Sequence, residues 1–278
     1  MTTYVETVPH DLVEQYKQKI ETGKEIAKGK KIVFCGLARN CAGRIENNID
    51  QLNELGKNFA DYRIIILENN SDDGTKEKLL DRKDAILIGK DDEENFSQGF
   101  DESRIERLSR YRTEVQKYIK RLYSDYDYVL VLDFDVNAWS VDGVLTSLSW
   151  DRNFDMMGSY SQIYHPQLGS HDGWVNHDRW AFKFHSWTEE FSENQRSDMT
   201  WFWYWRPPVG SKPIPCLSSF GGLGIYKMQA YLSGKYGSRH PFQTKEQITS
   251  EHNEFHRSMI EAGYVNVYLN PSQRCIIG

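Results

Sequence analysis

Apolar runs of strand type alternate with amphipathic helical segments in the first half of this 278-residue chain. The runs KIVFCGLARN, YRIIILENNSDDGT, DAILIG and DYVLVLDFD begin at residues 31, 62, 84 and 127. Apolar residues at helical spacing fill residues 45–59 and 104–123 between them. This alternation predicts an α/β fold with a mostly parallel, doubly wound sheet and helices on both faces. The length suits one large domain of this kind.

Polar side chains collect where each predicted strand ends. The set comprises Arg39, Asn40, Glu68, Asn69, Asn70, Asp72, Asp91, Asp92, Asp133 and Asp135. In open parallel sheets, ligands bind in the crevice outside the carboxyl ends of the strands. We therefore expect these residues to lie together along one edge of the sheet and to form the functional site.

Asp133 and Asp135 are the most informative pair in this set. Alternate residues of an extended segment point to the same face, so the two carboxylates repel each other. A hard divalent cation relieves this repulsion, and Mg²⁺ or Mn²⁺ is held by one or two carboxylates together with substrate phosphates. A metal site is favoured over an ordinary strand end. It is also favoured over the Asp nucleophile of haloacid-dehalogenase phosphatases, because three predicted strands precede Asp133 and that motif normally lies near the N-terminus of its core.

The predicted helix at residues 104–123 carries a charge on its apolar stripe. Arg112 completes a stripe that is otherwise formed by Ile105, Leu108, Val115, Ile119 and Leu122. A buried charge is costly unless it is paired. Arg112 either extends to the edge of the sheet or reaches an anionic partner. We favour the anionic partner, since this helix leads directly into Asp133 and Asp135.

Composition and charge argue against several classes of protein. The formal net charge is −6, whereas nucleic-acid-binding proteins are usually basic, so we expect no nucleic-acid partner. The N-terminus lacks the apolar region of a signal peptide, and no stretch reaches the roughly 20 apolar residues of a membrane span. The four cysteines include no C-x-x-C pair, which indicates reduced thiols and a cytoplasmic location.

Residues 1–30 are predicted to form an N-terminal helical segment. Leu12, Val13, Tyr16 and Ile20 recur at helical spacing, and four lysines follow within residues 24–31. The pattern indicates a packing helix with a solvated basic end. Contact with a membrane surface is the alternative.

Residues 141–278 have a different character, with many aromatic residues between 151 and 225. FDMMGSY at residues 154–160 and RWAFKFH at residues 179–185 are predicted strands. Further on, SEHNEFH places His252 and His256 on one helix face. This spacing can bind zinc, but it lacks the central Glu of H-E-x-x-H and a third ligand.

LARN, LENNSDDGT, the Arg-bearing helix and VLVLDFD together resemble the nucleotide-binding half of GT-A fold glycosyltransferases. LENNSDDGT is similar to the V-D-(D/N)-(G/S)-S-x-D-G-T turn of those enzymes. Residues 102–136 most resemble the fungal capsule-associated mannosyltransferase type, in which an R-I-x-x-L-x-x-x-R helix precedes the acidic motif. WVNHDRWAF, SSFGGLGIY and SEHNEFHRSMIEAGYVNVYLNPS are similar to later segments of that type. The resemblance implies a single GT-A domain at residues 31–278, with a nucleotide-binding half at 31–140 and an acceptor half at 141–278.

The resemblance also implies roles for individual residues. Contacts to a nucleotide-sugar fall to Ala38, Arg39, Glu68, Asn70, Arg112, Asp133 and Gly222. Glu68 takes the position of the carboxylate that contacts the nucleoside, and Asp133 faces the ribose or a metal-bound water. Asp135 ligates the metal, with His252 as a further ligand, and Glu251 serves as the base or positions the acceptor. Asn69 and Asn70 stand where Asp is frequent, which leaves the preferred base of the nucleotide open.

These features predict a metal-dependent glycosyltransferase that uses Mn²⁺ or Mg²⁺. It would move a hexose from a nucleotide-sugar to a glycan or lipid-linked acceptor, with mannose from GDP-mannose favoured and a UDP-sugar as the other donor. Aromatic residues at 174–205 form an acceptor platform or fill the core. The alternatives are a non-catalytic glycan- or nucleotide-binding relative and a haloacid-dehalogenase-type phosphatase.

Overall fold

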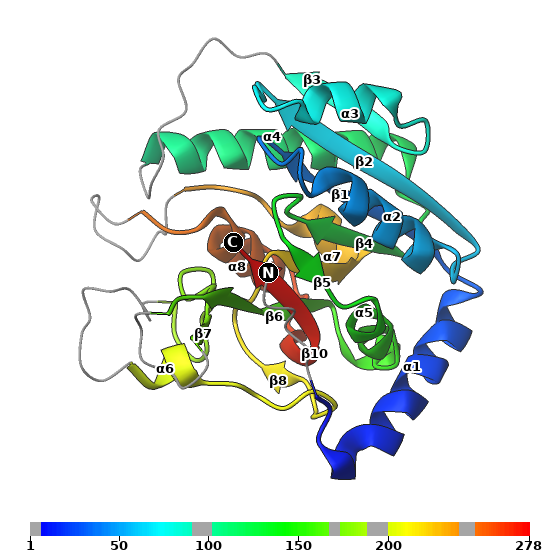
Figure 1. Cartoon of the computed structure of the whole chain (residues 1–278), viewed down its shortest axis with the longest axis vertical. Coiled ribbons are helices and arrows are strands. Elements are labelled where there is room, and N and C mark those ends of the chain that lie inside the picture. The colour runs from blue at the N-terminus through cyan, green and yellow to red at the C-terminus, as the bar shows by residue number, and fades with distance from the viewer. Residues whose placement is uncertain (1–6, 91–101, 167–172, 188–199, 239–247) are drawn as a thin grey trace.

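The computed structural model describes residues 7–90, 102–166, 173–187, 200–238 and 248–278. The strands of these residues form one mixed sheet in the order β3-β2-β1-β4-β9-β6-β10-β5, in which β7 also pairs with β6 and β8 with β10. The strands are β1 (Lys31–Ala38), β2 (Asp61–Asn69), β3 (Ile86–Lys90), β4 (Tyr128–Leu132), β5 (Ala138–Trp139), β6 (Met156–Tyr164), β7 (Trp174–Asn176), β8 (Ile214–Pro215), β9 (Leu223–Lys227) and β10 (Val267–Ile277). The helices (Figure 1) are η1 (His10–Leu12), α1 (Val13–Ala27), α2 (Ile45–Gly56), α3 (Thr75–Asp81), α4 (Glu102–Leu122), α5 (Val141–Leu148), η2 (Asp151–Asn153), α6 (Thr200–Tyr204), α7 (Met228–Ser233) and α8 (Glu251–Glu261).

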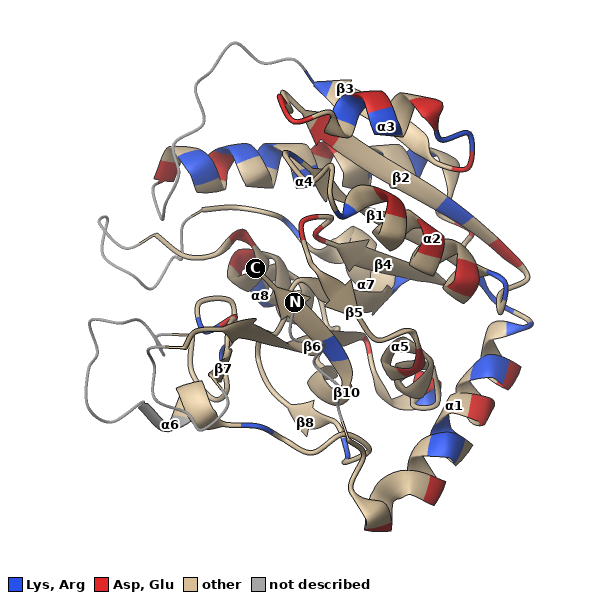
Figure 2. Ribbon diagram, in the orientation of Figure 1, with Lys and Arg blue, Asp and Glu red and all other residues tan. Residues whose placement is uncertain are grey.

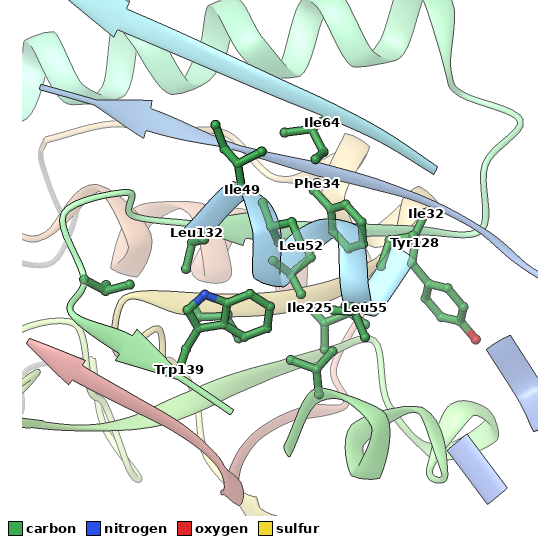
Figure 3. Packing of buried hydrophobic residues seen from close by; sticks show 14 of the residues in the cluster. Ile32, Phe34, Ile49, Leu52, Leu55, Ile64, Tyr128, Leu132, Trp139 and Ile225 are labelled. Carbon is green, nitrogen blue, oxygen red and sulfur yellow. The ribbon is translucent and has the colours of Figure 1, made fainter. Parts of the chain in front are cut away.

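Strands β1 to β4 confirm the predicted parallel part of the sheet. β1 pairs in parallel with β2 and β4, and β2 pairs in parallel with β3. The side chains of β1 alternate between two core layers, as a strand requires. Ile32 and Phe34 pack with Ile49 and Leu52 of α2 (Figure 3), whereas Val33 lies in the layer that contains residues of α4. Helices therefore cover both faces, as predicted.

Strand β9 joins the two halves of the chain into one sheet. It pairs antiparallel with β4 on one side and with β6 on the other, and β6 pairs in parallel with β10. Strand β4 thus lies between the first-half strand β1 and the second-half strand β9. Asp133, directly after β4, is therefore placed where the two halves of the chain meet.

The prediction of a strand at RWAFKFH is wrong. Residues 179–181 form a turn, and Lys183 contributes only an isolated bridge to Ser218. The Asp178 carboxylate accepts a hydrogen bond from the Ala181 backbone at 3.2 Å and so closes this turn. The apolar pattern is explained by burial, because Ala181 and Phe182 lie in the core.

The N-terminal helix α1 packs against α5, as expected for a packing helix (Figure 1). Its lysines form i,i+3 pairs with glutamates, at 3.1 Å for Lys17 and Glu14 and 2.7 Å for Lys24 and Glu21. The exposed side of α1 accordingly alternates in charge (Figure 2). This mixed charge favours the packing helix over the membrane-surface alternative.

Two predictions about the whole chain can be compared with the structure. All four cysteines are buried and free of disulfide bonds, as expected. Across the ranges that the structure describes, no helix combines the length and apolar character that crossing a membrane requires.

Asp91 and Asp92, which we expected at the end of β3, lie outside the described residues.

The contact between α1 and α5 leads to a first testable prediction. A Cβ atom added at Gly23 would lie 1.9 Å from the carbonyl oxygen of Leu145, so Gly23→Ala forces the two helices apart. We expect the free energy of unfolding to fall by about 1–3 kcal/mol, as for other overpacked contacts. Chemical denaturation measures this loss. Gly29→Ala is the matched control, because nothing lies within 4 Å of its added Cβ atom, and an equal loss in both variants would contradict the prediction.

Candidate functional site

The carboxyl ends of β1, β2 and β4 meet at one edge of the sheet, as the sequence predicts. Ala38, at the end of β1, is paired in register with Glu68 near the end of β2, and the partly buried Arg39 follows it. The loops beyond these strands are linked to each other. Asn40 donates its backbone N–H to Ser71 Oγ at 3.1 Å, and its Oδ1 accepts from the Asp72 backbone at 3.0 Å.

Asn40 and Asn70 hold the left-handed backbone conformation that these loops need. Their φ angles are 47° and 45°, a region that Asn tolerates better than most residues. The two asparagines therefore shape the edge of the site. The contact of Asn70 with a nucleotide stays a prediction.

Glu68 is fully buried, yet only one of its carboxylate oxygens is used. Oε1 accepts a hydrogen bond from the Ser71 backbone at 2.8 Å. Oε2 is buried and has no hydrogen-bond partner within the described part of the chain. A buried carboxylate oxygen without a partner is costly, and a bound ligand, ion or water is one way to satisfy it.

Arg112 of α4 bridges two acidic residues that are distant in sequence. Its Nη2 donates to Asp133 Oδ1 at 2.7 Å, and its Nε donates to Glu251 Oε1 at 3.0 Å. The side chains of Arg112 and Glu251 are 5% and 7% exposed, whereas that of Asp133 is 31% exposed. The expectation that Arg112 reaches the acidic cluster is thus met, and Asp133 is the member of the trio that faces solvent.

Electrostatics keeps Arg112 charged inside the protein. Burial opposes its charge, but Asp133 and Glu251 outweigh that effect and raise the pKa of Arg112 well above its usual value. The guanidinium also lies 5.4 Å from the ring centre of Phe220, within cation–π range. Arg112 is therefore a permanent positive charge that holds a carboxylate on each side.

Asp135 is exposed and lies beyond the ion pairs of Arg112. Desolvation by the surrounding protein and the nearby Asp133 raise the pKa of Asp135. Within the described ranges, no group of three or more His, Cys, Asp or Glu side chains is arranged to hold a metal ion. One or two carboxylates at an open edge match the way in which Mg²⁺ and Mn²⁺ are held together with phosphates. The residues present therefore fit the expected cation.

Asn48 of α2 anchors the loop that carries Asp135, a role that was not predicted from the sequence. Its Nδ2 donates to the carbonyls of Phe134 and Val136 at 3.1 and 3.0 Å, and its Oδ1 accepts from Trp139 Nε1 at 3.1 Å. These two carbonyls flank Asp135 in the chain. A signal was present, because Asn48 is a polar residue beside the apolar stripe of residues 45–59.

His252 and His256 of α8 have different environments. His256 is fully buried, with Nδ1 2.7 Å from Ser218 Oγ and Nε2 2.9 Å from Tyr226 OH. Both of its ring nitrogens are used, which removes the basis for a zinc site shared with His252. His252 stacks on Phe220 with ring centres 3.6 Å apart. Neither of its ring nitrogens has a hydrogen-bond partner in the described residues. Its role as a metal ligand remains a prediction.

Gly222 contacts the site through its backbone. Gly221 and Gly222 have φ angles of 63° and 83°, which favour glycine. The carbonyl of Gly222 accepts a hydrogen bond from the Asp133 backbone at 2.9 Å. This backbone therefore approaches Asp133 closely, while the contact of Gly222 with a nucleotide-sugar stays a prediction.

Comparison with known proteins supports the fold. No protein-family model and no curated protein matches the chain. Glucosyl-3-phosphoglycerate synthase from Mycobacterium tuberculosis, solved with phosphoglyceric acid, has a TM-score of 0.50 and 14% identity over 93% of this chain and 74% of its own. The same synthase in complex with Mn²⁺, UDP and phosphoglyceric acid has a TM-score of 0.50 and 13% identity over 93% and 73% of the two chains.

A further solved structure, described as a mycobacterial protein, has a TM-score of 0.50 and 12% identity over 93% of this chain and 69% of its own. At such low identity these similarities concern the fold. They do not distinguish the fungal capsule-associated type from other glycosyltransferases. Together with the sheet topology, they establish the GT-A fold that the sequence predicts.

The buried His256 leads to a prediction about pH. Burial lowers the pKa of His256 to about 3, whereas an unfolded histidine has a pKa of about 6.5. Between these two pKa values, His256 binds a proton in the unfolded chain but not in the folded chain. Its contribution to the free energy of unfolding is therefore fully present above about pH 6.5 and is lost as the pH falls towards 3. We expect His256→Gln to make the dependence of unfolding free energy on pH shallower by up to about 1.4 kcal/mol per pH unit between pH 6 and 4.

Denaturant titrations of both proteins at several pH values measure this difference. Comparison at pH 8 gives the cost of the substitution itself, because histidine is neutral there in both the folded and the unfolded chain. Parallel curves for the wild type and the variant between pH 6 and 4 would contradict a neutral, buried His256.

Proposed function

We propose that this chain is a metal-dependent glycosyltransferase that moves a hexose from a nucleotide-sugar to a glycan or lipid-linked acceptor. The observation that carries the proposal is the pair at the end of β4. Asp133 is held by Arg112, and Asp135 is left exposed beside it. We interpret residues 31–140 as the nucleotide-binding half and residues 141–278 as the acceptor half of one domain.

The nucleoside would bind beside the ends of β1 and β2. The unpartnered Oε2 of Glu68 can accept hydrogen bonds from ribose hydroxyls or from the base. Ala38, Arg39 and Asn70 lie in or next to the strand ends that border this position. The diphosphate would then extend towards Asp133 and Asp135, where a divalent cation could join it to the protein.

Charge stabilisation is the main chemical task at this site. When a nucleoside diphosphate departs, negative charge develops on it, and a metal held by Asp135 would act there as a Lewis acid. Arg112 holds Asp133 in one orientation before substrate arrives, so little reorganisation is needed during the reaction. His252 lies next to Glu251, with Nε2 3.7 Å from Glu251 Oε1, and is the further metal ligand that we propose.

Glu251 is the proposed base. Its Oε1 accepts from Arg112, which leaves the other carboxylate oxygen outside this ion pair. In an inverting transfer, that oxygen would take the proton of the acceptor hydroxyl. A retaining transfer would require only that donor and acceptor are positioned.

The solved structures support the proposal through a shared fold. The Mycobacterium tuberculosis synthase was solved with Mn²⁺, UDP and phosphoglyceric acid, a set that contains a divalent metal, a nucleotide and a small substrate. Mannose from GDP-mannose is the donor that we favour, on the resemblance of residues 102–136 to the fungal capsule-associated type. A UDP-sugar is the second candidate.

The alternatives have less support from the site. A phosphatase of the haloacid-dehalogenase type would need Asp133 as its nucleophile, whereas Asp133 Oδ1 is engaged by Arg112 at 2.7 Å. A non-catalytic relative would have no need for a charged trio and an exposed acid at the carboxyl edge of the sheet. Turnover distinguishes this relative from an enzyme.

Nucleotide binding is the first test. We expect GDP or UDP to bind in calorimetric titration with Mn²⁺, and binding to be lost with EDTA. Asp135→Asn should weaken metal-dependent binding by at least about tenfold, because a ligand of the cation loses its charge. Asp81→Asn is the control, since Asp81 is an exposed acid at the end of α3. If neither nucleotide binds when Mn²⁺ is present, a donor site at these aspartates is ruled out.

Transfer itself is the second test. Incubation with GDP-mannose or a UDP-hexose, Mn²⁺ and an acceptor should release the nucleoside diphosphate. Asp135→Ala should reduce this release by about 100-fold or more, since it removes a group that acts on the transition state. Glycan binding that persists in both proteins without any release in the wild type would identify a binding module instead.

A further inference from the structure

The turn formed by Phe220, Gly221 and Gly222 contacts two of the three charged residues, Arg112 and Asp133. The Phe220 ring stacks on His252 and lies below the guanidinium of Arg112. The Gly222 carbonyl holds the backbone of Asp133 at 2.9 Å. The position of this turn, Phe220–Gly221–Gly222, therefore sets the positions of the groups that surround the proposed leaving group.

Asp178 holds this turn from the acceptor half of the chain. Its Oδ2 accepts a hydrogen bond from the Gly221 backbone at 2.6 Å, and its Oδ1 accepts from the Ala181 backbone at 3.2 Å. Ser159 of β6 clamps the other side, since its Oγ lies 2.9 Å from the Phe220 carbonyl and 2.7 Å from the Gly221 carbonyl. The turn is thus fixed through both its N–H and its carbonyl groups.

The cavity beside Asp178 is too small for a substrate. Its volume is about 10 Å³, and its lining includes Asp178, Gly221 and the serines of β6. This is about the room that one water molecule needs. Both carboxylate oxygens of Asp178 already accept backbone hydrogen bonds. The geometry therefore suits a residue that positions others rather than one that binds a ligand.

We propose that Asp178 is a positioning residue for sugar transfer. It acts by fixing the turn Phe220–Gly221–Gly222, which holds Asp133 and supports His252 and Arg112. This inference rests on the proposed function. Without the Asp178 carboxylate, the N–H of the buried Gly221 loses its acceptor, and the turn loses one of its two clamps. Shifts of about 1 Å at a reacting centre cost about 100-fold in rate.

The test compares Asp178→Ala with Asp178→Asn. Asparagine keeps a carbonyl oxygen that can accept from Gly221, whereas alanine keeps none. We expect Asp178→Ala to lower kcat by about 100-fold and to weaken Mn²⁺-dependent nucleotide binding by about tenfold in calorimetry. Asp178→Asn should recover most of both losses, to within about tenfold of the wild-type kcat.

Asp155→Ala is the matched control. Asp155 precedes β6, and its Oδ2 accepts from the Asn266 backbone at 2.9 Å, so it loses a similar hydrogen bond away from the turn. Denaturant unfolding of all variants measures the structural cost of each change. The inference is overturned if Asp178→Ala keeps the wild-type kcat and nucleotide affinity. It is also overturned if Asp155→Ala loses both to the same extent, or if Asp178→Asn is as impaired as Asp178→Ala.

Failure of the proposed function gives a different result. In that case the wild-type protein itself shows neither metal-dependent nucleotide binding nor transfer, and both proposals fall together. If the wild type binds and transfers, the three variants decide on Asp178 alone.

Discussion

The ion pairs of Arg112 with Asp133 and Glu251 are the interaction on which the site depends. They connect α4, the end of β4 and the start of α8, three elements that are far apart in sequence. Burial of a guanidinium is tolerated because two carboxylates compensate its charge. Loss of one partner from such a buried pair costs about 3–5 kcal/mol in general, mostly because the remaining charge is left uncompensated. This constraint holds both carboxylates at the sheet edge.

The acidic loop after β4 is held by groups from both halves of the chain. Asn48 of α2 binds the carbonyls on either side of Asp135, while the Gly222 carbonyl binds the backbone of Asp133. Antiparallel strand β9 brings Gly222 there, because it pairs directly with β4. The proposed donor site in the first half is thereby connected with the second half, where the proposed acceptor would bind.

Periodicity in the sequence predicted the elements well. The four apolar runs form β1 to β4, and the stripe around Ile49 and Leu52 forms α2 with its apolar side in the core. The strand predicted at RWAFKFH is wrong because Asp178 closes a turn at Ala181. The segment has the apolar pattern of a strand because residues such as Phe182 are buried in the core. The two histidines of α8 show the same limit. Their spacing places them on one helix face, but only the folded chain shows that Ser218 and Tyr226 use both nitrogens of His256.

The sequence by itself determined the α/β class, the parallel strands and the gathering of acids at their carboxyl ends, because strand and helix periodicity are local and parallel strands share one edge. It also indicated that Arg112 needs a partner, since a charge on a buried stripe is costly. Only the tertiary structure decided that Glu251 is the second partner, that Asn48 and Gly222 hold the acidic loop, and that Asp178 supports the turn. Each of these is a contact between residues distant in sequence, set by sheet order and hydrogen-bond geometry, and local pattern does not say which residues make such contacts.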